Sequence, residues 1–433
     1  MPDWVHFPQE LIDAIVNEVH NSRDLKSCSL VSRSFSSRTR ALLFHRINLR
    51  AIRYVENFVF TKFHEICLSS PQLSASVKIL GISKYGKISR STPPPAGGIL
   101  DLIIQSLPNL GVITLLDVRM DYFLDGSLAC LSSYSFLGIH LNDVVFDNID
   151  QLYELISGSP QLKSLILSRS VLVFNEESQR SAAYLASPQV EDLVLKYDDN
   201  PAHRVGSGIL ESIFRQGGCP FSLERVRRLT INVGHHHKVD FDRANAILAA
   251  TSQTLQELTV VLNPFSYWPH FRPESPLHIL CFGSTRKILF SFIHGFDTTV
   301  NLWWCIRNLI HIRDKVGQST IEELAFEIVA DDVAVAIKEW AELDELLSNP
   351  PFSDTFRRLR VTIIQHPDLD PTAEAQRADF GSFFPSLSQK GGVSFSLDYS
   401  EWKQFFKYRE DWRRSDWYSA LGFKSMTKVA FYH

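Results

Sequence analysis

The 433-residue chain lacks the paired cysteines from which disulfide frameworks and zinc sites are built. Its six cysteines are widely scattered, and no two of them stand in a Cys-x-x-Cys spacing. Such free thiols are typical of reducing compartments. No apolar run approaches the roughly 18 residues of a membrane span, and the start Met-Pro-Asp-Trp-Val-His lacks the basic and apolar regions of a signal peptide. We therefore expect a cytoplasmic or nuclear protein that does not enter a membrane.

A large charge of one sign is also missing. The formal net charge is −4, which gives no overall electrostatic attraction to nucleic acid or to an anionic membrane. The composition, 45% hydrophobic and 21% charged, is that of an ordinary globular protein. The length is sufficient for two or more domains.

Recognisable catalytic motifs are missing as well, including the Gly-x-Ser-x-Gly elbow and the Walker A loop. The run His235–His237 follows a predicted strand and has no acidic or thiol partner at ligand spacing, which favours a solvated loop over a metal site. Asp368 and Asp370 match the Asp-x-Asp-x-Thr element of haloacid-dehalogenase-type phosphatases. Because residues 365–367 separate Asp368 from the preceding apolar run, an Asx turn explains the match better. We expect no catalytic residue, no metal and no cofactor.

The first fifty residues contain a compact pattern of three short helices. We place Pro8 at the first helical position and Asp24 at the N-cap of the second helix, and we expect a serine-rich turn over residues 32–37. The third helix leads into an alternating, strand-like pattern. The apolar positions at helical spacing are Leu11, Ile15, Val16 and Val19 in the first helix, and Leu25, Cys28 and Val31 in the second.

The residues of these helices match a known pattern in order. They read Phe-Pro-x-Glu-Leu-x-x-x-Ile, then Asp-Leu-x-x-Cys-Ser-Leu-Val-Ser-Arg-x-Phe, then Leu-Leu-Phe-x-x-Ile. Over about residues 5 to 49 the chain thus resembles the F-box, especially that of the large and divergent fungal F-box families. Phe7 stands where many members have Leu, and Phe35 where many have Trp. The resemblance implies binding to a Skp-type adaptor through anchors drawn from Phe7, Pro8, Leu11, Ile12, Ile15, Leu30, Val31 and Phe35. Some of these eight must pack the helices together instead, and the sequence does not separate the two sets.

The rest of the chain repeats one short template, apolar-x-x-apolar-x-apolar. The first seven copies start 26 to 36 residues apart, and weaker echoes occur at Ile288/Phe290 and Val393/Phe395. Helix-like segments lie between them, at residues 99–107, 149–156, 208–214 and 244–249. The nine clear copies are Val77/Leu80/Ile82, Leu110/Ile113/Leu115, Phe136/Ile139/Leu141, Leu162/Leu165/Leu167, Val190/Leu193/Leu195, Val226/Leu229/Ile231, Leu255/Leu258/Val260, Ile321/Leu324/Phe326 and Phe356/Leu359/Val361.

A strand and a helix in each irregular repeat predict a mixed α/β fold. We expect an irregular leucine-rich-repeat-like solenoid with a parallel concave sheet, in which the template residues form the core. A doubly wound parallel sheet is the alternative. It is disfavoured because its strands are usually continuous apolar runs and because the glycine fingerprints of nucleotide-binding folds are missing.

The positions between the template residues should face the concave side, which is the usual binding surface of such folds. Charges of both signs are mixed there, which suggests that neighbouring strands pair with each other and argues against nucleic acid as a partner. A loop over residues 264–273 is rich in aromatic residues and proline, and we expect it to pack onto the edge of the solenoid. A recognition loop for a partner is the alternative, since interfaces favour aromatic residues. The candidates for binding a protein substrate are Asp192, Lys196, Arg228, Glu257, Glu323, Arg358, Arg360 and Trp268.

These patterns predict a helical F-box domain over residues 1–50, a degenerate repeat body over 51–400 and an aromatic-rich C-terminal cap over 401–433. By resemblance, the chain would be the substrate-receptor subunit of an SCF-type cullin–RING ubiquitin ligase. Its F-box would bind the Skp adaptor, and through it a cullin, while the repeat body held a protein substrate. Two other hypotheses stay open: an F-box and repeat scaffold that acts outside ubiquitylation, and a cryptic hydrolase built on Asp368 and Asp370. The sequence does not identify the substrate.

Overall fold

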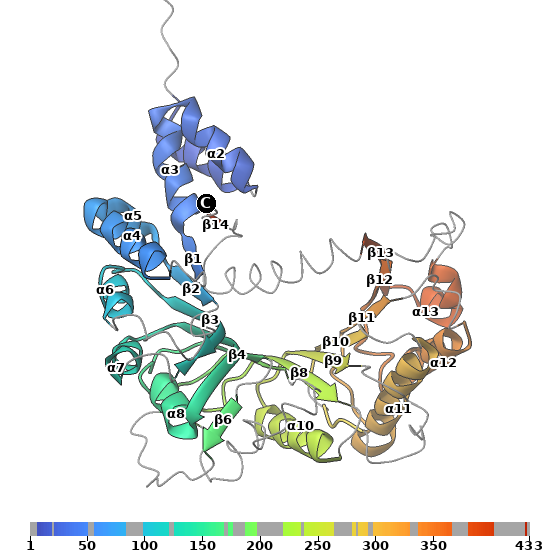
Figure 1. Ribbon diagram of the computed structural model, residues 1–433. Coiled ribbons are helices and arrows are strands. Elements are labelled where there is room, and N and C mark those ends of the chain that lie inside the picture. The colour runs from blue at the N-terminus through green and yellow to red at the C-terminus, as the bar shows by residue number, and fades with distance from the viewer. Residues whose placement is uncertain are drawn as a thin grey trace, which may run out of the picture. The chain divides into compact units, whose positions relative to one another are not determined.

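The structure is a computed structural model of the chain (Figure 1). It describes residues 7–19, 21–50, 56–83, 98–120, 125–168, 172–175, 187–196, 220–234, 238–263, 279–282, 285–292, 298–329, 337–365, 380–401 and 429–430. These residues form a mixed α/β structure in which each strand runs parallel to the strand it pairs with. None of the helices in these ranges has both the length and the hydropathy that crossing a bilayer requires.

The chain divides into two compact units. One comprises residues 1–188, 203–221 and 408–433, and the other comprises residues 189–202 and 222–407. Each unit contains its own run of parallel strands with helices between them.

The first unit begins with three helices that share a small core: α1 (Gln9–Asn17), α2 (Ser22–Val31) and α3 (Arg33–Phe44). That core consists of Ile12, Val16, Leu25 and Leu43. Two polar contacts fasten α1 to α3. The side-chain amide of Gln9 donates to the Ser34 carbonyl at 2.9 Å, and Arg38 Nε donates to Asn17 Oδ1 at 2.7 Å. The start of α1 therefore lies beside the start of α3.

Three local predictions for these helices are wrong. Pro8 is the N-cap of α1 rather than its first helical residue. Asn21 caps α2 in place of Asp24, because its Oδ1 accepts a hydrogen bond from the backbone N–H of Arg23 at 3.0 Å. Residues 33–37 are not a turn but the first turns of α3, since Phe35 packs against the helical core and tertiary packing overrides the preference of serine for turns.

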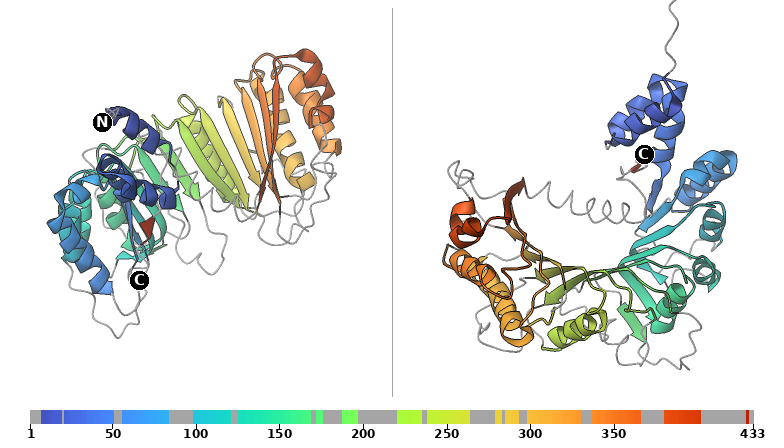
Figure 2. Two further views of the ribbon diagram at one scale, coloured as in Figure 1. Left: turned by 90° about the horizontal axis from the view of Figure 1, so that it is seen from above. Right: turned by 180° about the vertical axis from the view of Figure 1, so that it is seen from behind.

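The remainder of the first unit is an open parallel sheet with the strand order β1-β2-β3-β4-β5. Beside this path β6 pairs with β4, and β14 pairs with β1. The helices α4 to α8 cover one face of the sheet (Figures 1 and 2). The strands are β1 (Arg46–Arg50), β2 (Ile79–Ser83), β3 (Val112–Arg119), β4 (Gly138–Asn148), β5 (Ser164–Ser168), β6 (Leu172–Asn175) and β14 (Val429–Ala430), and the helices are α4 (Glu56–Ser69), α5 (Pro71–Ser76), α6 (Ile99–Gln105), α7 (Asp125–Ser133) and α8 (Ile149–Ser157).

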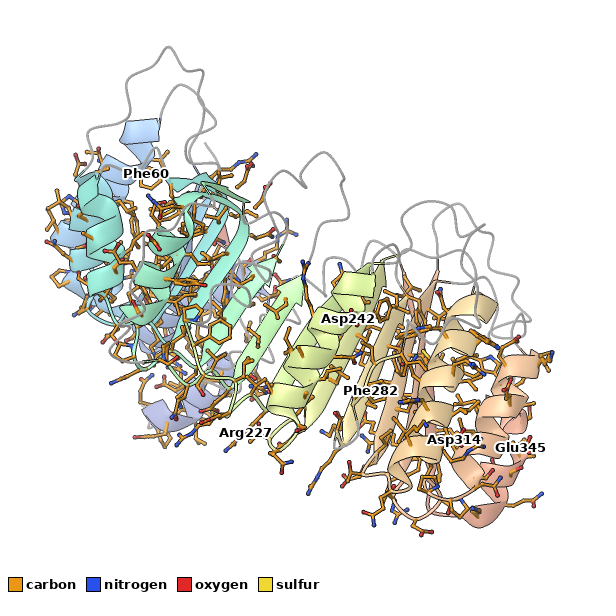
Figure 3. All side chains as sticks on the ribbon, turned by 90° about the horizontal axis from the view of Figure 1, so that it is seen from below. Phe60, Arg227, Asp242, Phe282, Asp314 and Glu345 are labelled. Carbon is orange, nitrogen blue, oxygen red and sulfur yellow. The ribbon has the colours of Figure 1, made fainter. Side chains whose placement is uncertain are left out.

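The second unit repeats this plan with the strand order β7-β8-β9-β10-β11-β12-β13. Its helices also lie along one face of the sheet, and Asp242, Asp314 and Glu345 mark the outer side of α10, α11 and α12 in Figure 3. The strands are β7 (Asp192–Lys196), β8 (Arg228–Gly234), β9 (Glu257–Asn263), β10 (Lys287–Phe292), β11 (Glu323–Val329), β12 (Arg358–Gln365) and β13 (Ser394–Glu401), and the helices are α10 (Lys238–Thr251), α11 (Thr298–Val316), α12 (Ile337–Ser348), the 3₁₀ turn η7 (Phe380–Phe383) and α13 (Pro385–Lys390).

Most strands of both units are joined to the strand before them by the same backbone contact. Two consecutive backbone N–H groups at the start of a strand donate to one carbonyl group, which belongs to the residue just before the preceding strand. In the first unit Gly111 and Val112 donate to the Lys78 carbonyl at 2.9 and 3.0 Å, and in the second Glu322 and Glu323 donate to the Arg286 carbonyl at 2.7 and 3.1 Å. This recurring link fixes the register, so that equivalent template positions of successive strands lie side by side.

The predicted core is confirmed residue by residue. Every residue of the nine template copies is buried. In register, Leu80 stands beside Ile113, and Leu324 stands beside Leu359. The weaker echo at Ile288/Phe290 is the buried strand β10. Burying one continuous apolar row per template position gives these short strands a core that none of them could form alone.

The doubly wound alternative does not fit either unit. Apart from β6 and β14, the strands of each unit follow one another in chain order, and the helices cover a single face, whereas a doubly wound sheet carries helices on both faces and reverses its strand order. The predicted helices at residues 99–107, 149–156 and 244–249 correspond to α6, α8 and α10. The predicted helix at 208–214 lies outside the described residues, as do residues 402–428 and 431–433 of the predicted cap. The described Val429 and Ala430 pair with Ile47 and Asn48 of β1.

Candidate partner-binding surfaces

Helix α1 carries apolar side chains on two sides. Ile12 and Val16 face the helical core, where Val16 has no exposed surface. Leu11 and Ile15 are each more than half exposed, and Phe7, just before the helix, is 63% exposed. At about 100° per residue the four side chains span an arc of about 140° around the helix. Ile12 and Val16 lie toward the buried edge of this arc, and Leu11 and Ile15 lie toward its exposed edge. The predicted stripe of Leu11, Ile15, Val16 and Val19 is therefore only half correct: Val16 and Val19 pack on the helical core, whereas Leu11 and Ile15 are exposed. Helix α1 is more apolar than its own core requires.

A second set of exposed apolar residues lies where α2 ends. Leu30 is 86% exposed and Val31 is 69% exposed, whereas Leu25 of the same helix is buried in the core. The hydrogen bond from Gln9 to Ser34 brings this corner beside the start of α1. We call the five exposed residues the N-terminal apolar surface: Phe7, Leu11, Ile15, Leu30 and Val31.

The N-terminal apolar surface stands out against the rest of the described chain. Of the nine large hydrophobic residues that are exposed within the described ranges, these five fall within 25 consecutive positions. The other four, Leu68, Leu102, Leu116 and Ile337, are spread over the remainder. Single exposed hydrophobic residues are normal on a protein surface, but a concentration of them indicates an interaction site.

The structure separates the eight residues that the sequence analysis named as anchors. Five of them form the N-terminal apolar surface. Ile12 is a core residue of the three helices, and Phe35 is half-buried against the same core. Pro8 is exposed, and its carbonyl accepts the backbone N–H groups of Leu11 and Ile12 at 3.1 and 3.3 Å, so it starts the helix that presents the surface. The sequence alone could not separate the anchors that pack in the core from those that are exposed.

A ladder of alternating charges crosses the sheet of the second unit. In register, the first positions of six successive strands are Asp192, Arg228, Glu257, Lys287, Glu323 and Arg358. Three ion pairs form along this row. Arg228 binds the Asp192 carboxylate through two nitrogens, with Nη2 2.6 Å from Oδ2; Lys287 Nζ lies 3.1 Å from Glu257 Oε1; and Arg358 Nη1 lies 3.8 Å from Glu323 Oε2. The predicted pairing of charges between neighbouring strands is confirmed for these three pairs.

The candidate substrate-binding residues differ in whether they are held in these ion pairs. Asp192, Arg228, Glu257, Glu323 and Arg358 are held in the charge ladder, so that a ligand would have to compete with a partner already in place. Arg360 is half-buried on β12 and has no ion pair within the described residues. Lys196 ends β7, but its side chain lies outside the described residues, and so does Trp268.

Asp192 is the most buried member of the ladder. Burial raises the pKa of its carboxyl, against the opposing effect of the hydrogen bond and positive charge of Arg228. An ion pair in this position gains Coulombic energy but loses hydration, so its net contribution to stability is small compared with the cost of removing one partner.

His45 lies between α3 and β1, and its side chain is buried. Burial, followed by the positive charges of Lys78, Arg38 and Arg46, lowers the pKa of the imidazole to about 3. The imidazole is therefore neutral in the folded protein at neutral and mildly acidic pH. Since the unfolded side chain has a pKa near 6.5, His45 links folding to pH.

We expect the first unit to lose stability as the pH falls below about 6.5. Between that pH and about 3 the unfolded chain binds a proton that the folded chain does not, so His45 lowers the free energy of unfolding by up to about 1.4 kcal/mol per pH unit. Urea unfolding of the wild type and of His45→Gln at pH 7.5 and pH 5.5 measures this slope. The variant should lose roughly 1 kcal/mol less than the wild type between the two pH values; an equal loss in both proteins would contradict the prediction.

Two groups of residues were missed at the sequence level. Lys287 was not named as a surface residue because only a weak echo of the template marks β10. Exposed cations on α2 and α3 were also overlooked, although residues 21–50 contain seven lysine and arginine residues and a single acidic residue, Asp24. That local imbalance was visible in the sequence but hidden by the net charge of the whole chain.

Neither of the two possible chemical sites of the sequence falls within the described structure. His235–His237 and Asp368/Asp370 lie outside it. Among the residues that are described, no three His, Cys, Asp or Glu side chains come together in a way that could hold a metal ion.

Comparison with known proteins does not identify a family for the chain. No protein-family model matches the chain. No curated protein matches it in sequence.

Proposed function

We propose that the chain is the substrate-receptor subunit of an SCF-type cullin–RING ubiquitin ligase. In this proposal the helices α1 to α3 are an F-box that binds a Skp-type adaptor through the N-terminal apolar surface. The parallel strands and their helices are an irregular leucine-rich-repeat-like solenoid that holds a protein substrate. The chain would then contribute proximity and orientation rather than reacting groups.

The observation that carries the proposal is the N-terminal apolar surface. A unit of three short helices with a four-residue core needs most of its apolar side chains for its own stability. It nevertheless leaves five large apolar side chains in solvent, and it does so at positions that match the F-box pattern. Leaving Leu30 and Val31 exposed forgoes about 1.5 to 3 kcal/mol of burial each, and a partner that covers them would recover it.

The two compact units support the second half of the proposal. Short parallel strands in chain order, with helices on one face, are the arrangement expected of repeat proteins, whose open sheet face is available to partners. The charge ladder occupies one row of that face in the second unit. Because its members are paired, substrate recognition would rely on the positions between and beyond these pairs.

Removal of exposed leucines tests the adaptor contact. Leu11→Ala and Leu30→Ala should each weaken binding of a purified Skp-type adaptor about tenfold, because each removes an anchor of more than about 1 kcal/mol. Isothermal titration calorimetry with the full-length chain measures the affinity. Leu68→Ala is the matched control: Leu68 is a leucine of α4 that is 65% exposed but lies outside the N-terminal apolar surface, and its replacement should leave the affinity unchanged.

The result that would reject the proposal is equally definite. A folded wild-type chain that does not bind the adaptor has no F-box function, and equal effects of Leu30→Ala and Leu68→Ala would remove the N-terminal apolar surface from the contact. Circular dichroism confirms that each variant is folded. Because the replaced side chains are exposed, the variants should keep wild-type stability.

Affinity purification of the chain from cells under proteasome inhibition, followed by mass spectrometry, separates the ligase from the alternative scaffold function. A ligase receptor recovers the adaptor together with a cullin, and proteins that accumulate only under inhibition are its candidate substrates. Recovery of the adaptor without a cullin would favour the scaffold that acts outside ubiquitylation.

A further inference from the structure

The α2 and α3 surface of the first unit carries a concentration of positive charge. Four basic side chains are exposed there: Arg23 and Lys26 on α2, and Arg33 and Arg40 on α3. None of them forms an ion pair within the described part of the chain, whereas Arg38 is held by its hydrogen bond to Asn17. Four unpaired cations on two adjacent short helices contrast with a formal net charge of −4 for the whole chain.

These cations adjoin the N-terminal apolar surface. On α2, Arg23 and Lys26 stand three residues apart, and Leu30 follows Lys26 by four, so the three lie on one side of the helix. The same side is exposed, while Leu25 faces the core. On α3, Arg33 directly follows the α2–α3 corner, and Arg40 lies two turns further along. A partner that covers Leu30 and Val31 therefore also meets positive charge.

Helix α1 has the opposite character. Its residues include Glu10 and Asp13 and no basic residue, and Glu18 follows as its C-cap. Helix α1 is fastened to α3 by the contact between Arg38 and Asn17. The three-helix unit is thus divided into an acidic helix and a basic pair of helices, with apolar anchors on both. This division disfavours nucleic acid or an anionic membrane as the partner, because the phosphates that the cations attract would be repelled by α1.

We propose that the N-terminal apolar surface binds an apolar groove of a protein whose rim beside α2 and α3 carries carboxylates. Arg23, Lys26, Arg33 and Arg40 face that rim. They guide the partner into place and fix its orientation, because matched charge distributions raise the association rate and disfavour the reversed docking. This inference rests on the proposed function, in which the partner is a Skp-type adaptor, and it states the chemistry of the adaptor surface that receives the chain.

Charge reversal tests the inference. In Arg23→Glu/Lys26→Glu the association rate constant for the purified Skp-type adaptor, measured by stopped flow in 50 mM salt, should fall at least tenfold. In 500 mM salt the difference should shrink to about twofold, because the dissolved ions then screen charge–charge interactions beyond a few ångströms. The dissociation rate constant should change less than the association rate constant, since exposed charges at an interface act mainly on encounter.

The matched control is Arg225→Glu/Arg227→Glu. Both arginines are exposed in the second unit just before β8, and Arg227 is labelled in Figure 3. This control changes the net charge by the same amount as the test variant, so a general effect of net charge would appear in both. Only the test variant should slow association.

The outcomes distinguish this inference from the proposed function. A wild-type chain that does not bind the adaptor overturns both. Binding that is independent of salt, or that is slowed equally by both double variants, overturns the inference alone and leaves adaptor docking intact. Binding of a labelled oligonucleotide or of phosphatidylserine vesicles that is lost in Arg23→Glu/Lys26→Glu, with unchanged adaptor kinetics, would also overturn it.

Discussion

Replacement of Phe326 by alanine should lower the free energy of unfolding of the second unit by about 4 kcal/mol. Phe326 is fully buried on β11, where it stacks on Phe290 and Phe292 with ring centroids 5.8 and 6.4 Å away. Trp340 of α12 meets it edge-on at 5.7 Å. The substitution leaves a cavity between the sheet and its helices, and the neighbouring rings cannot all move to fill it.

Native-state hydrogen exchange of the β10, β11 and β12 amides measures this loss within the second unit, which avoids the assumption that the whole chain unfolds in one step. Phe326→Leu keeps most of the volume and should cost only about 1 to 1.5 kcal/mol. Phe395→Ala, at the half-buried edge strand β13, is the positional control and should also cost less. A loss for Phe326→Ala no greater than that for Phe395→Ala would contradict the central place of Phe326 in the core.

Breaking the ion pair at the start of the charge ladder should have the next largest effect. Arg228→Met leaves the Asp192 carboxylate buried without its cation and should destabilise the second unit by roughly 2 to 3 kcal/mol at pH 7. Removing both charges together in Asp192→Asn/Arg228→Met should cost less than Arg228→Met alone, because no buried charge is then left unpaired. Urea unfolding of the two single variants and the double variant gives the coupling energy.

The pH dependence of Arg228→Met provides a second readout. Burial already raises the pKa of Asp192, and loss of Arg228 removes the effect that opposes this rise. The folded variant should therefore take up a proton at a higher pH than the wild type, and its deficit in stability should be largest at pH 7 and smaller near pH 4.5.

The matched control for Arg228→Met is Lys287→Met, which breaks an exposed ion pair of the same ladder and should cost less than about 1 kcal/mol. Equal costs for Arg228→Met and Lys287→Met would mean that the burial of Asp192 does not affect the stability of its ion pair.

The fold could be predicted from the sequence where the information is local and repeated. A template of three apolar positions specifies a strand with one buried face, and its recurrence implies neighbours that stack in register. For this reason Leu80, Ile113 and Leu324 were correctly placed in the core. The helices between the strands were found for the same reason, because apolar spacing in α6 and α8 is a property of a few adjacent residues.

Prediction was weaker where two local signals compete. The hydroxyl groups of residues 32–37 favour a turn, but Phe35 belongs to the core of the helices, and burial of its ring outweighs the local preference. Asn21 and Asp24 are both good N-cap residues, and only the backbone geometry of Asn21 decides between them. Local preferences of this kind are worth only about 1 kcal/mol each, so contacts elsewhere in the fold decide between them.

Spacing along the chain was enough to predict three short helices followed by strand and helix repeats, because it sets which side chains share a face. Contacts between distant segments select which apolar residues of the helices enter the core and which remain outside. Leu11 and Ile12 are adjacent and equally apolar, yet Ile12 is buried and Leu11 is exposed. The difference arises from Leu25 and Leu43, which reach Ile12 from other helices. The ladder that pairs Asp192 with Arg228 has the same origin, since its partners lie 36 positions apart and meet only when the strands stack.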